Sequence, residues 1–148
     1  MSFSANTAIL AWESFVTLES SGASVSSGAI SAAAGTSVTS TQHQDAPLVE
    51  VTAAVTFSTN PTAGKAVSLT YTPLTVDGTS GHNANASNAT NFRPLGFDFV
   101  KASTSEQYLN FGIQATPSKE FDLRVLNQTD QAFTWKLYLR PVSTIPHA

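Results

Sequence analysis

Three histidines are the residues of this sequence best suited to acid–base or metal chemistry near neutral pH: His43, His82 and His147. No two of them have the close spacing that zinc ligands show along a chain, and the sequence contains no Cys. Disulfides, thiol catalysis and cysteine metal sites are therefore excluded. Each histidine falls in a segment that we expect to be a loop or a tail, so we expect solvated side chains and predict no metal site.

Serine and the carboxylates are the other candidates for catalysis. No Gly-x-Ser-x-Gly elbow supports a serine nucleophile. The acidic residues that could form a catalytic pair are Asp77, Asp98, Glu106, Glu120, Asp122 and Asp130. Asp98 and Asp122 occupy outward positions of expected strands, where a charge keeps a sheet soluble, and Asp77-Gly78-Thr79 fits a turn better than a calcium loop. We predict that the protein is not an enzyme and has no cofactor.

The composition excludes further classes of partner. Charged residues make up only 11% of the 148 residues, the formal net charge is −3, and the seven basic residues are scattered. Phosphate binding requires a basic stripe, so we expect no nucleic acid partner. No apolar run approaches the length of a membrane span, and the first residues lack a basic signal region. We expect one soluble domain, made in the cytoplasm and without a membrane partner.

Period-two alternation on both sides of a polar cluster marks residues 120–140. The alternating apolar residues are Phe121, Leu123 and Val125 before the cluster, and Phe133, Trp135, Leu137 and Leu139 after it. This pattern predicts a β-hairpin with one dry face. The register that we predict pairs Val125 with Phe133 and Asp122 with Lys136.

Further strands are predicted at residues 9–19, 48–58, 66–76, 95–100 and 106–113 from the same alternation. The predicted inward residues are Leu10, Trp12, Val16, Leu18, Val49, Val51, Ala53, Val55, Phe57, Val67, Leu69, Tyr71, Leu95, Phe97, Phe99, Leu109, Phe111 and Ile113. No segment gives a convincing helix. The sequence predicts an all-β fold: a single antiparallel β-sandwich of jelly-roll or Greek-key type.

Residues 20–46 contain only Val25, Ile30 and Val38 as larger apolar side chains. One interpretation is a long flexible linker. We favour an extended arm with one or two weak strands, which small side chains allow to lie flat against another surface. The chain then divides into an N-terminal strand and arm, residues 1–47, and a β-sandwich body, residues 48–148, within one structural domain.

The most polar stretch is residues 77–94, which we predict to be a long surface loop. Long loops in compact domains are usually functional or disordered. The polar residues that would make it an exposed functional loop are Asp77, His82, Asn83, Asn85, Asn88 and Asn91.

Three stretches of the second half of the chain follow each other in a recognisable order: VSLTYTPLTVDGTS (67–80), RPLGFDFV (93–100) and KEFDLRVLNQTDQAFTWKLYLRP (119–141). They give a strand into an Asp-Gly-Thr turn, a Leu-Gly-Phe strand, and a Phe-led strand before a closing Leu-x-Leu strand. In this order residues 48–141 resemble the head decoration, or cement, proteins of tailed bacteriophages. The resemblance implies a small β-sandwich, often trimeric, that binds the outside of an icosahedral shell without catalytic residues.

We therefore expect a capsid decoration protein on the virion exterior, a homotrimer whose partner is the major capsid protein of a phage shell. Val25, Ile30 and Val38 are the predicted contacts of the arm with the capsid or a neighbouring copy. The alternative is a carbohydrate- or receptor-binding module of a phage tail or fibre. Sugar sites usually need exposed Trp or Tyr beside Asn or Asp; both tryptophans are predicted inward, and only Tyr108 and Tyr138 outward.

Overall fold

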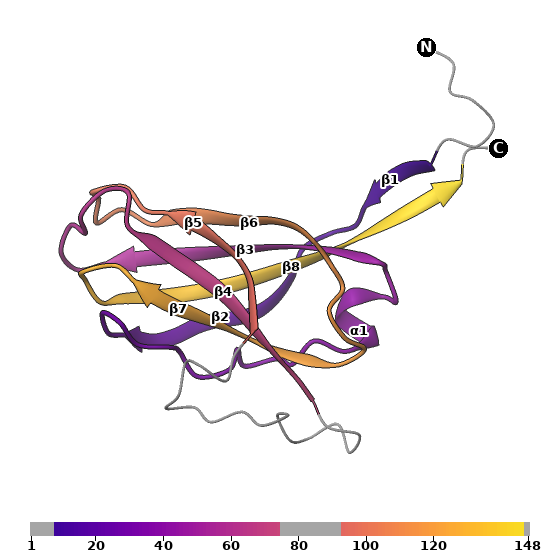
Figure 1. The fold of residues 1–148 in the computed structure, drawn as a ribbon, viewed down its shortest axis with the longest axis horizontal. Helices are drawn as coiled ribbons and strands as arrows, with labels where there is room; N and C mark the ends of the chain where they lie inside the picture. The colour runs from indigo at the N-terminus through magenta and orange to yellow at the C-terminus, as the bar shows by residue number, and fades with distance from the viewer. Residues whose placement is uncertain (1–7, 75–92, 147–148) are drawn as a thin grey trace, which may run out of the picture.

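The computed structural model describes residues 8–74 and 93–146, which form two antiparallel β-sheets and one short helix (Figure 1). Sheet A contains β1 (Ala8–Trp12), β2 (Val16–Val25), β3 (Leu48–Phe57), β6 (Gln107–Ala115) and β8 (Phe133–Pro146). Sheet B contains β4 (Ala66–Pro73), β5 (Arg93–Phe99) and β7 (Phe121–Gln128). The helix is α1 (Ser40–His43). The all-β prediction is confirmed.

β8 is the strand of sheet A that pairs with the most neighbours, namely β1, β2 and β3. β3 pairs along one edge of β8, and β6 pairs with β3. β2 and β1 share the other edge: β2 pairs with residues 133–139 and β1 with residues 142–146. In sheet B, β4 lies between β5 and β7. The 14-residue length of β8 lets the two N-terminal strands follow each other along one edge.

The predicted hairpin between β7 and β8 is wrong. β7 pairs with β4 in sheet B, whereas β8 pairs with β1, β2 and β3 in sheet A. Asp122 therefore lies opposite Thr72, and Lys136 lies opposite Ala54. Alternation of apolar and polar residues shows which side chains point into a core. Two strands on facing sheets show the same alternation as two hydrogen-bonded neighbours, so the pattern alone does not identify the pairing partner.

A buried polar cluster holds the corner where the chain crosses from β7 to β8. The Asn127 Nδ2 donates to the carbonyls of Val25 and Gln131, at 2.9 and 2.8 Å. Its Oδ1 accepts from the backbone N–H and the hydroxyl of Thr129, at 2.9 and 2.7 Å. Asn127 and Thr129 are both buried, and a buried amide costs little when all its groups are bonded. The polar cluster that predicted a hairpin turn instead fixes a change of sheet.

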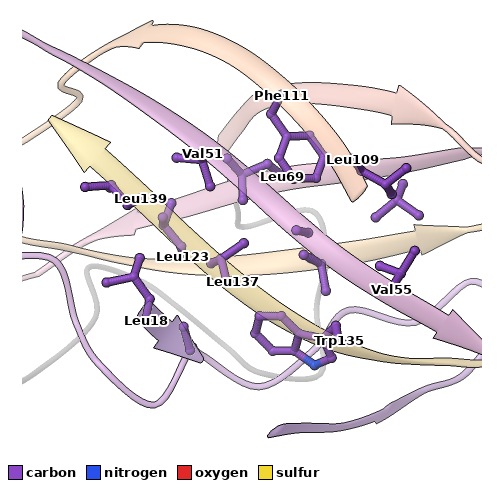
Figure 2. Close-up of a cluster of buried hydrophobic side chains, with 14 of the residues drawn as sticks. Leu18, Val51, Val55, Leu69, Leu109, Phe111, Leu123, Trp135, Leu137 and Leu139 are labelled. Atoms are coloured by element: carbon purple, nitrogen blue, oxygen red, sulfur yellow. The ribbon is translucent and has the colours of Figure 1, made fainter. Parts of the chain in front are cut away.

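The core lies between the two sheets and draws on both (Figure 2). The predicted inward residues of β3 and β8 are all buried, as are Leu18, Val67, Leu69, Leu109 and Phe111. Trp135 lies over β2 at its partner Gly22, where a Cβ atom would stand 2.3 Å from the indole Nε1. The absence of a side chain at Gly22 therefore makes room for the largest ring of the core.

The segment from Gly28 to Val38 lies along the outer edge of β7. The backbone N–H groups of Gly28, Ser31, Ala34 and Val38 donate to carbonyls of β7, and two isolated bridges, Ile30 to Leu126 and Val38 to Phe121, mark the same pairing. The Thr36 N–H donates to the Leu18 carbonyl of β2. This segment, which we call the edge segment, thus connects the edge of sheet B to sheet A and satisfies an edge that would otherwise be open.

Several residues predicted to point inward are exposed: Leu10, Trp12, Phe97, Phe99 and Ile113. In β5 the inward position opposite Leu69 is Gly96, where a Cβ would lie 2.9 Å from the Phe111 carbonyl oxygen. Because β5 approaches β6 so closely, only glycine fits there, and the alternation turns Phe97 and Phe99 outward. The prediction took the large side chains for the buried ones; contact with the neighbouring sheet selected the other face.

Candidate binding surface

The outer face of sheet A, which points away from sheet B, contains an open hollow of about 330 Å³. Three adjacent strands form it, β8, β3 and β6, together with the connection between β1 and β2. Its lining residues are Phe15, Glu50, Thr52, Tyr108, Asn110, Tyr138 and Arg140. Polar side chains from the strands meet aromatic rings here, a combination typical of small-ligand sites.

The strand register places the polar side chains side by side. Glu50 of β3 lies opposite Arg140 of β8, and Thr52 lies opposite Tyr138 on one side and Asn110 on the other. Directly opposed residues of an antiparallel pair point to the same face, so these side chains share the outer surface.

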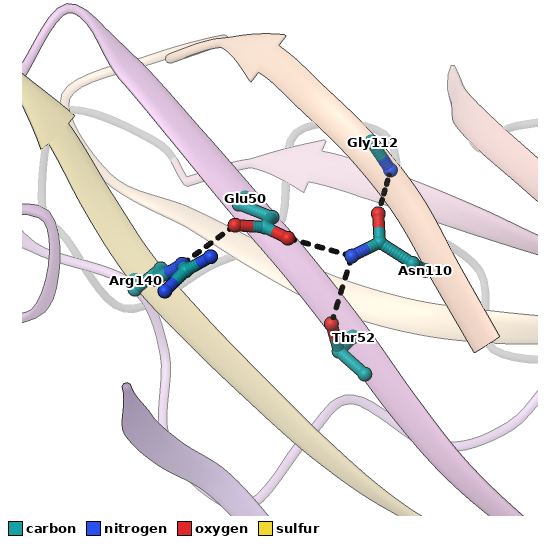
Figure 3. Close-up of polar contacts among 5 residues, drawn as sticks. All are labelled: Glu50, Thr52, Asn110, Gly112 and Arg140. Carbon is teal, nitrogen blue, oxygen red and sulfur yellow. Dashed lines mark hydrogen bonds and ion pairs between the residues drawn. The ribbon is translucent and has the colours of Figure 1, made fainter. Parts of the chain in front are cut away.

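A hydrogen-bonded network joins the three strands at this place (Figure 3). The Glu50 Oε2 accepts from the Arg140 Nε at 2.6 Å, and the Oε1 accepts from the Asn110 Nδ2 at 2.6 Å. Asn110 also approaches the Thr52 hydroxyl at 3.5 Å. Glu50 is buried although it points outward, because its neighbours cover it. Such a paired and bonded carboxylate is held rigidly, and its charge is balanced by Arg140.

A bulge in β6 orients Asn110. The pairing of β3 with β6 shifts between Glu50 and Thr52, and Gly112 has a φ of 80° there. This φ lies in the left-handed region of backbone conformation, which favours glycine. The conformation turns the Gly112 N–H back toward Asn110, where it donates to the Oδ1 at 2.7 Å. The carbonyl end of the amide is thereby occupied, and its NH₂ group points at Glu50.

Two aromatic rings enclose the guanidinium of Arg140. The Arg140 Cζ lies 4.6 Å from the ring centroid of Trp12 and 4.6 Å from that of Phe15. Both distances suit cation–π contacts, which the partial burial of the guanidinium strengthens. The ion pair with Glu50 and the two rings together fix one wall of the hollow.

Tyr108 forms the opposite wall and is 68% exposed. Its hydroxyl donates to the Glu106 Oε1 at 2.9 Å, and the Glu106 Oε2 pairs with the Lys136 Nζ at 2.7 Å. The hydrogen bond from Lys136, followed by that from Tyr108, lowers the pKa of Glu106, and the bond to Glu106 raises the pKa of Tyr108. Tyr108 also lines a second hollow, which Phe99 borders, so exposed aromatic rings continue from sheet A toward β5.

The residues predicted to contact a capsid or a neighbour lie elsewhere. Val25 and Val38 are buried in the core of this chain, and Ile30 is half-buried beside Leu126 of β7. Their positions do not favour the predicted contact with a partner. The predicted loop residues, Asp77, His82, Asn83, Asn85, Asn88 and Asn91, lie outside the described residues.

His43 is buried and fully bonded, contrary to the prediction of a solvated loop histidine. Its Nε2 donates to the Lys119 carbonyl at 2.8 Å, and its Nδ1 accepts from the Asp45 N–H at 3.0 Å. Because both ring nitrogens are occupied by the backbone, this histidine joins α1 to the segment before β7. Within residues 8–74 and 93–146, no group of three or more His, Cys, Asp or Glu side chains could hold a metal ion.

Sequence reasoning missed Glu50, Asn110 and Arg140, to which it assigned no functional role. The available signal was that polar residues occupy outward positions of three strands. The register of those strands was needed to show that they meet.

Comparison with known proteins adds no relative: no family model, no curated protein and no solved structure matches the chain. In the part of the chain that the structure describes, no helix is long and apolar enough to cross a membrane.

Proposed function

We propose that this chain is a non-enzymatic virion structural protein that binds the outer surface of a phage capsid and stabilises it. The resemblance of residues 67–80, 93–100 and 119–141 to phage head decoration proteins supports this function. Its partner is the major capsid protein, its location is the capsid exterior, and neither nucleic acid nor membrane takes part.

The observation that carries the proposal is a two-stranded ribbon that extends from the sandwich (Figure 1). β3 pairs with β8 only as far as Val142, so the last residues of β8, 143–146, pair with β1 alone. We call this part, residues 8–11 and 143–146, the terminal ribbon. Leu10 on this ribbon is 43% exposed.

A two-stranded ribbon is marginally stable by itself in water, and a third surface usually stabilises it. Within the described chain, no third strand pairs with the terminal ribbon. A shell protein that covers Leu10 would remove apolar surface from water and hold the ribbon in place. The ribbon therefore suits attachment to a large partner better than the buried Val25 and Val38 do.

The proposal includes a homotrimer and a jelly-roll or Greek-key connectivity. The chain crosses from sheet A to sheet B between β3 and β4, and it crosses between the sheets again at each connection from β5 to β6, β6 to β7 and β7 to β8. These crossings support that connectivity. A trimer that touches several shell subunits gains avidity from effective concentration, so each copy needs only a modest interface.

The test is the occupancy of undecorated shells by the variant Leu10→Ser, measured by quantitative mass spectrometry of purified particles. We expect normal folding and reduced occupancy, because the substitution removes an exposed apolar contact only. Phe97→Ser is the matched control, since Phe97 is also exposed but lies on β5. Equal occupancy by the parent and Leu10→Ser would exclude the terminal ribbon as the attachment site; a parent protein that fails to bind shells would overturn the function.

The alternative function, a carbohydrate- or receptor-binding module of a phage tail or fibre, is favoured by a separate observation. Trp12, which was predicted inward, and Tyr108 are both exposed on the outer face of sheet A, and a sugar site usually needs an exposed Trp or Tyr beside polar side chains. The chemistry of that face is independent of attachment through the terminal ribbon.

A further inference from the structure

We infer that the hollow on the outer face of sheet A is a binding site for an uncharged saccharide. The inference does not rest on attachment to a capsid, because the hollow and the terminal ribbon are different parts of the surface. It rests on the lining of the hollow: aromatic rings on its walls and hydrogen-bonding side chains on its floor.

The walls of the hollow provide apolar faces for the C–H surfaces of a sugar ring. Tyr108 lines it from β6, Tyr138 from β8, and Phe15 from the connection between β1 and β2. Phe15 is held by its contact with Arg140, and Tyr108 by its hydrogen bond to Glu106. Because these contacts exist without a ligand, little side-chain freedom is lost when a ligand binds.

The floor of the hollow provides donors and acceptors for sugar hydroxyls. The Thr52 hydroxyl can donate and accept, and each Glu50 oxygen has a second lone pair beside the bond that it already accepts. The guanidinium of Arg140 uses its Nε–H for Glu50, and its remaining N–H groups are further donors beside the hollow. Planar polar groups of this kind bind pairs of adjacent hydroxyls in two-point contacts.

The charge of the lining favours a neutral ligand. Among the described residues that line the hollow, Glu50 is the only acidic one and Arg140 the only basic one, and they pair at 2.6 Å, so their charges cancel. An anionic ligand would have to compete with Glu50 for Arg140, and a cationic ligand would have to compete with Arg140 for Glu50. An entirely apolar ligand would leave Thr52 and Glu50 without water, at a cost in free energy.

The size of the hollow fits a small ligand. Ligand sites commonly enclose about 300–1,000 Å³, and this hollow of about 330 Å³ lies at the small end of that range. The second hollow shares Tyr108 and is bordered by Phe99, Ser103 and Ser105. A short oligosaccharide can therefore extend from the first hollow past Tyr108 toward β5.

The experiment screens the purified full chain on a glycan array that carries neutral oligosaccharides and their sialylated counterparts. The neutral glycan that gives the highest signal is then titrated by calorimetry. We expect binding to neutral glycans, with an affinity that changes little with salt concentration because no net charge is involved. No binding to any glycan, or binding to sialylated glycans alone, overturns the inference.

The variant Tyr108→Ala locates the site. Tyr108 is exposed, so its removal should leave the fold intact, and we expect a loss of affinity of roughly tenfold or more from the missing ring face. Tyr108→Phe keeps the ring and should retain most of the affinity. Phe97→Ala, an exposed aromatic residue outside the hollow, is the matched control and should bind as the parent does.

Two results would contradict the site. If Tyr108→Ala binds the glycan as tightly as the parent, the saccharide binds elsewhere. If the parent forms an oligomer that Tyr108→Ala disrupts, and binds no glycan, this face is a contact between copies of the chain. Occupancy of shells by Tyr108→Ala separates this inference from the proposed function, because attachment through the terminal ribbon should be unchanged.

Discussion

The edge segment and the β1 strand of the terminal ribbon both come from the first 38 residues of the chain, yet their environments are opposite. The edge segment is poor in large side chains, and it is bonded along β7 with Val38 completely buried. The terminal ribbon has the larger side chain of Leu10, and that side chain is exposed. Side-chain size therefore did not decide which of the two segments joined the core.

The two segments differ in the hydrogen-bonding partners that are available to their backbones. The edge segment covers the open edge of sheet B, where a row of carbonyl groups of β7 accepts its N–H groups. Small residues such as Ser31 and Ala34 allow it to lie close to that edge. The terminal ribbon extends beyond the end of β3, and within residues 8–74 and 93–146 no third strand pairs with it (Figure 1). Hydrogen bonding and position, more than hydrophobicity, separate the two segments.

The largest effect is expected from the two tryptophans, which sharpen this comparison between buried and exposed positions. Trp135 is 3% exposed and packs over Gly22, so Trp135→Ala should lower the free energy of unfolding by about 3–5 kcal/mol. Trp12, at 45% exposed, mainly contacts Arg140, and Trp12→Ala should cost about 1 kcal/mol or less. Urea denaturation of both variants measures the difference; equal midpoints would mean that the two rings have the same burial.

A smaller effect is expected from a pair of serine substitutions that compares the two segments directly. Val38→Ser places a hydroxyl in the core and removes buried methyl groups, so it should cost roughly 2–3 kcal/mol. Leu10→Ser should cost no more than about 0.5 kcal/mol, as is usual at exposed positions.

Hydrogen exchange gives the matching backbone measurement. The amides of Ser31, Ala34 and Val38 should be protected in the parent, because each donates to β7. Rapid exchange of these amides, together with a stable Val38→Ser variant, would mean that the edge segment is a detached arm.

The smallest effect is expected at an exposed polar cluster on the outer face. The hydrogen bond from Lys136 lowers the pKa of Glu106. The ionised Glu106 therefore contributes to the stability of the folded protein at a pH above 4.5, the ordinary pKa of this side chain. This contribution is lost as the pH falls through the lowered pKa. Glu106→Gln should remove that part of the acid dependence and should also move the pKa of Tyr108 down toward 10, which an ultraviolet titration of tyrosine detects. An unchanged tyrosine titration would contradict the bond between Tyr108 and Glu106.

Strand alternation predicted a large part of the core. Val51, Val55 and Leu69 are buried as the sequence indicated. The candidate surface was predicted less well, because its network depends on which strands are neighbours. Glu50 meets Arg140 from 90 residues away and Asn110 from 60 residues away. A sequence pattern within one strand cannot show that residues so far apart in the chain are neighbours.

The sequence by itself determined the all-β class and, for β3, β7 and β8, which side chains face the core, because alternation with period two is a local property of a strand. Tertiary structure alone decided that β7 and β8 belong to different sheets, that Gly96 rather than Phe97 faces β6, and that the edge segment covers β7. Each of these outcomes depends on backbone hydrogen bonds and close contacts between distant segments. Such contacts are selected by the packing of the whole chain, and the residues of one strand do not encode them.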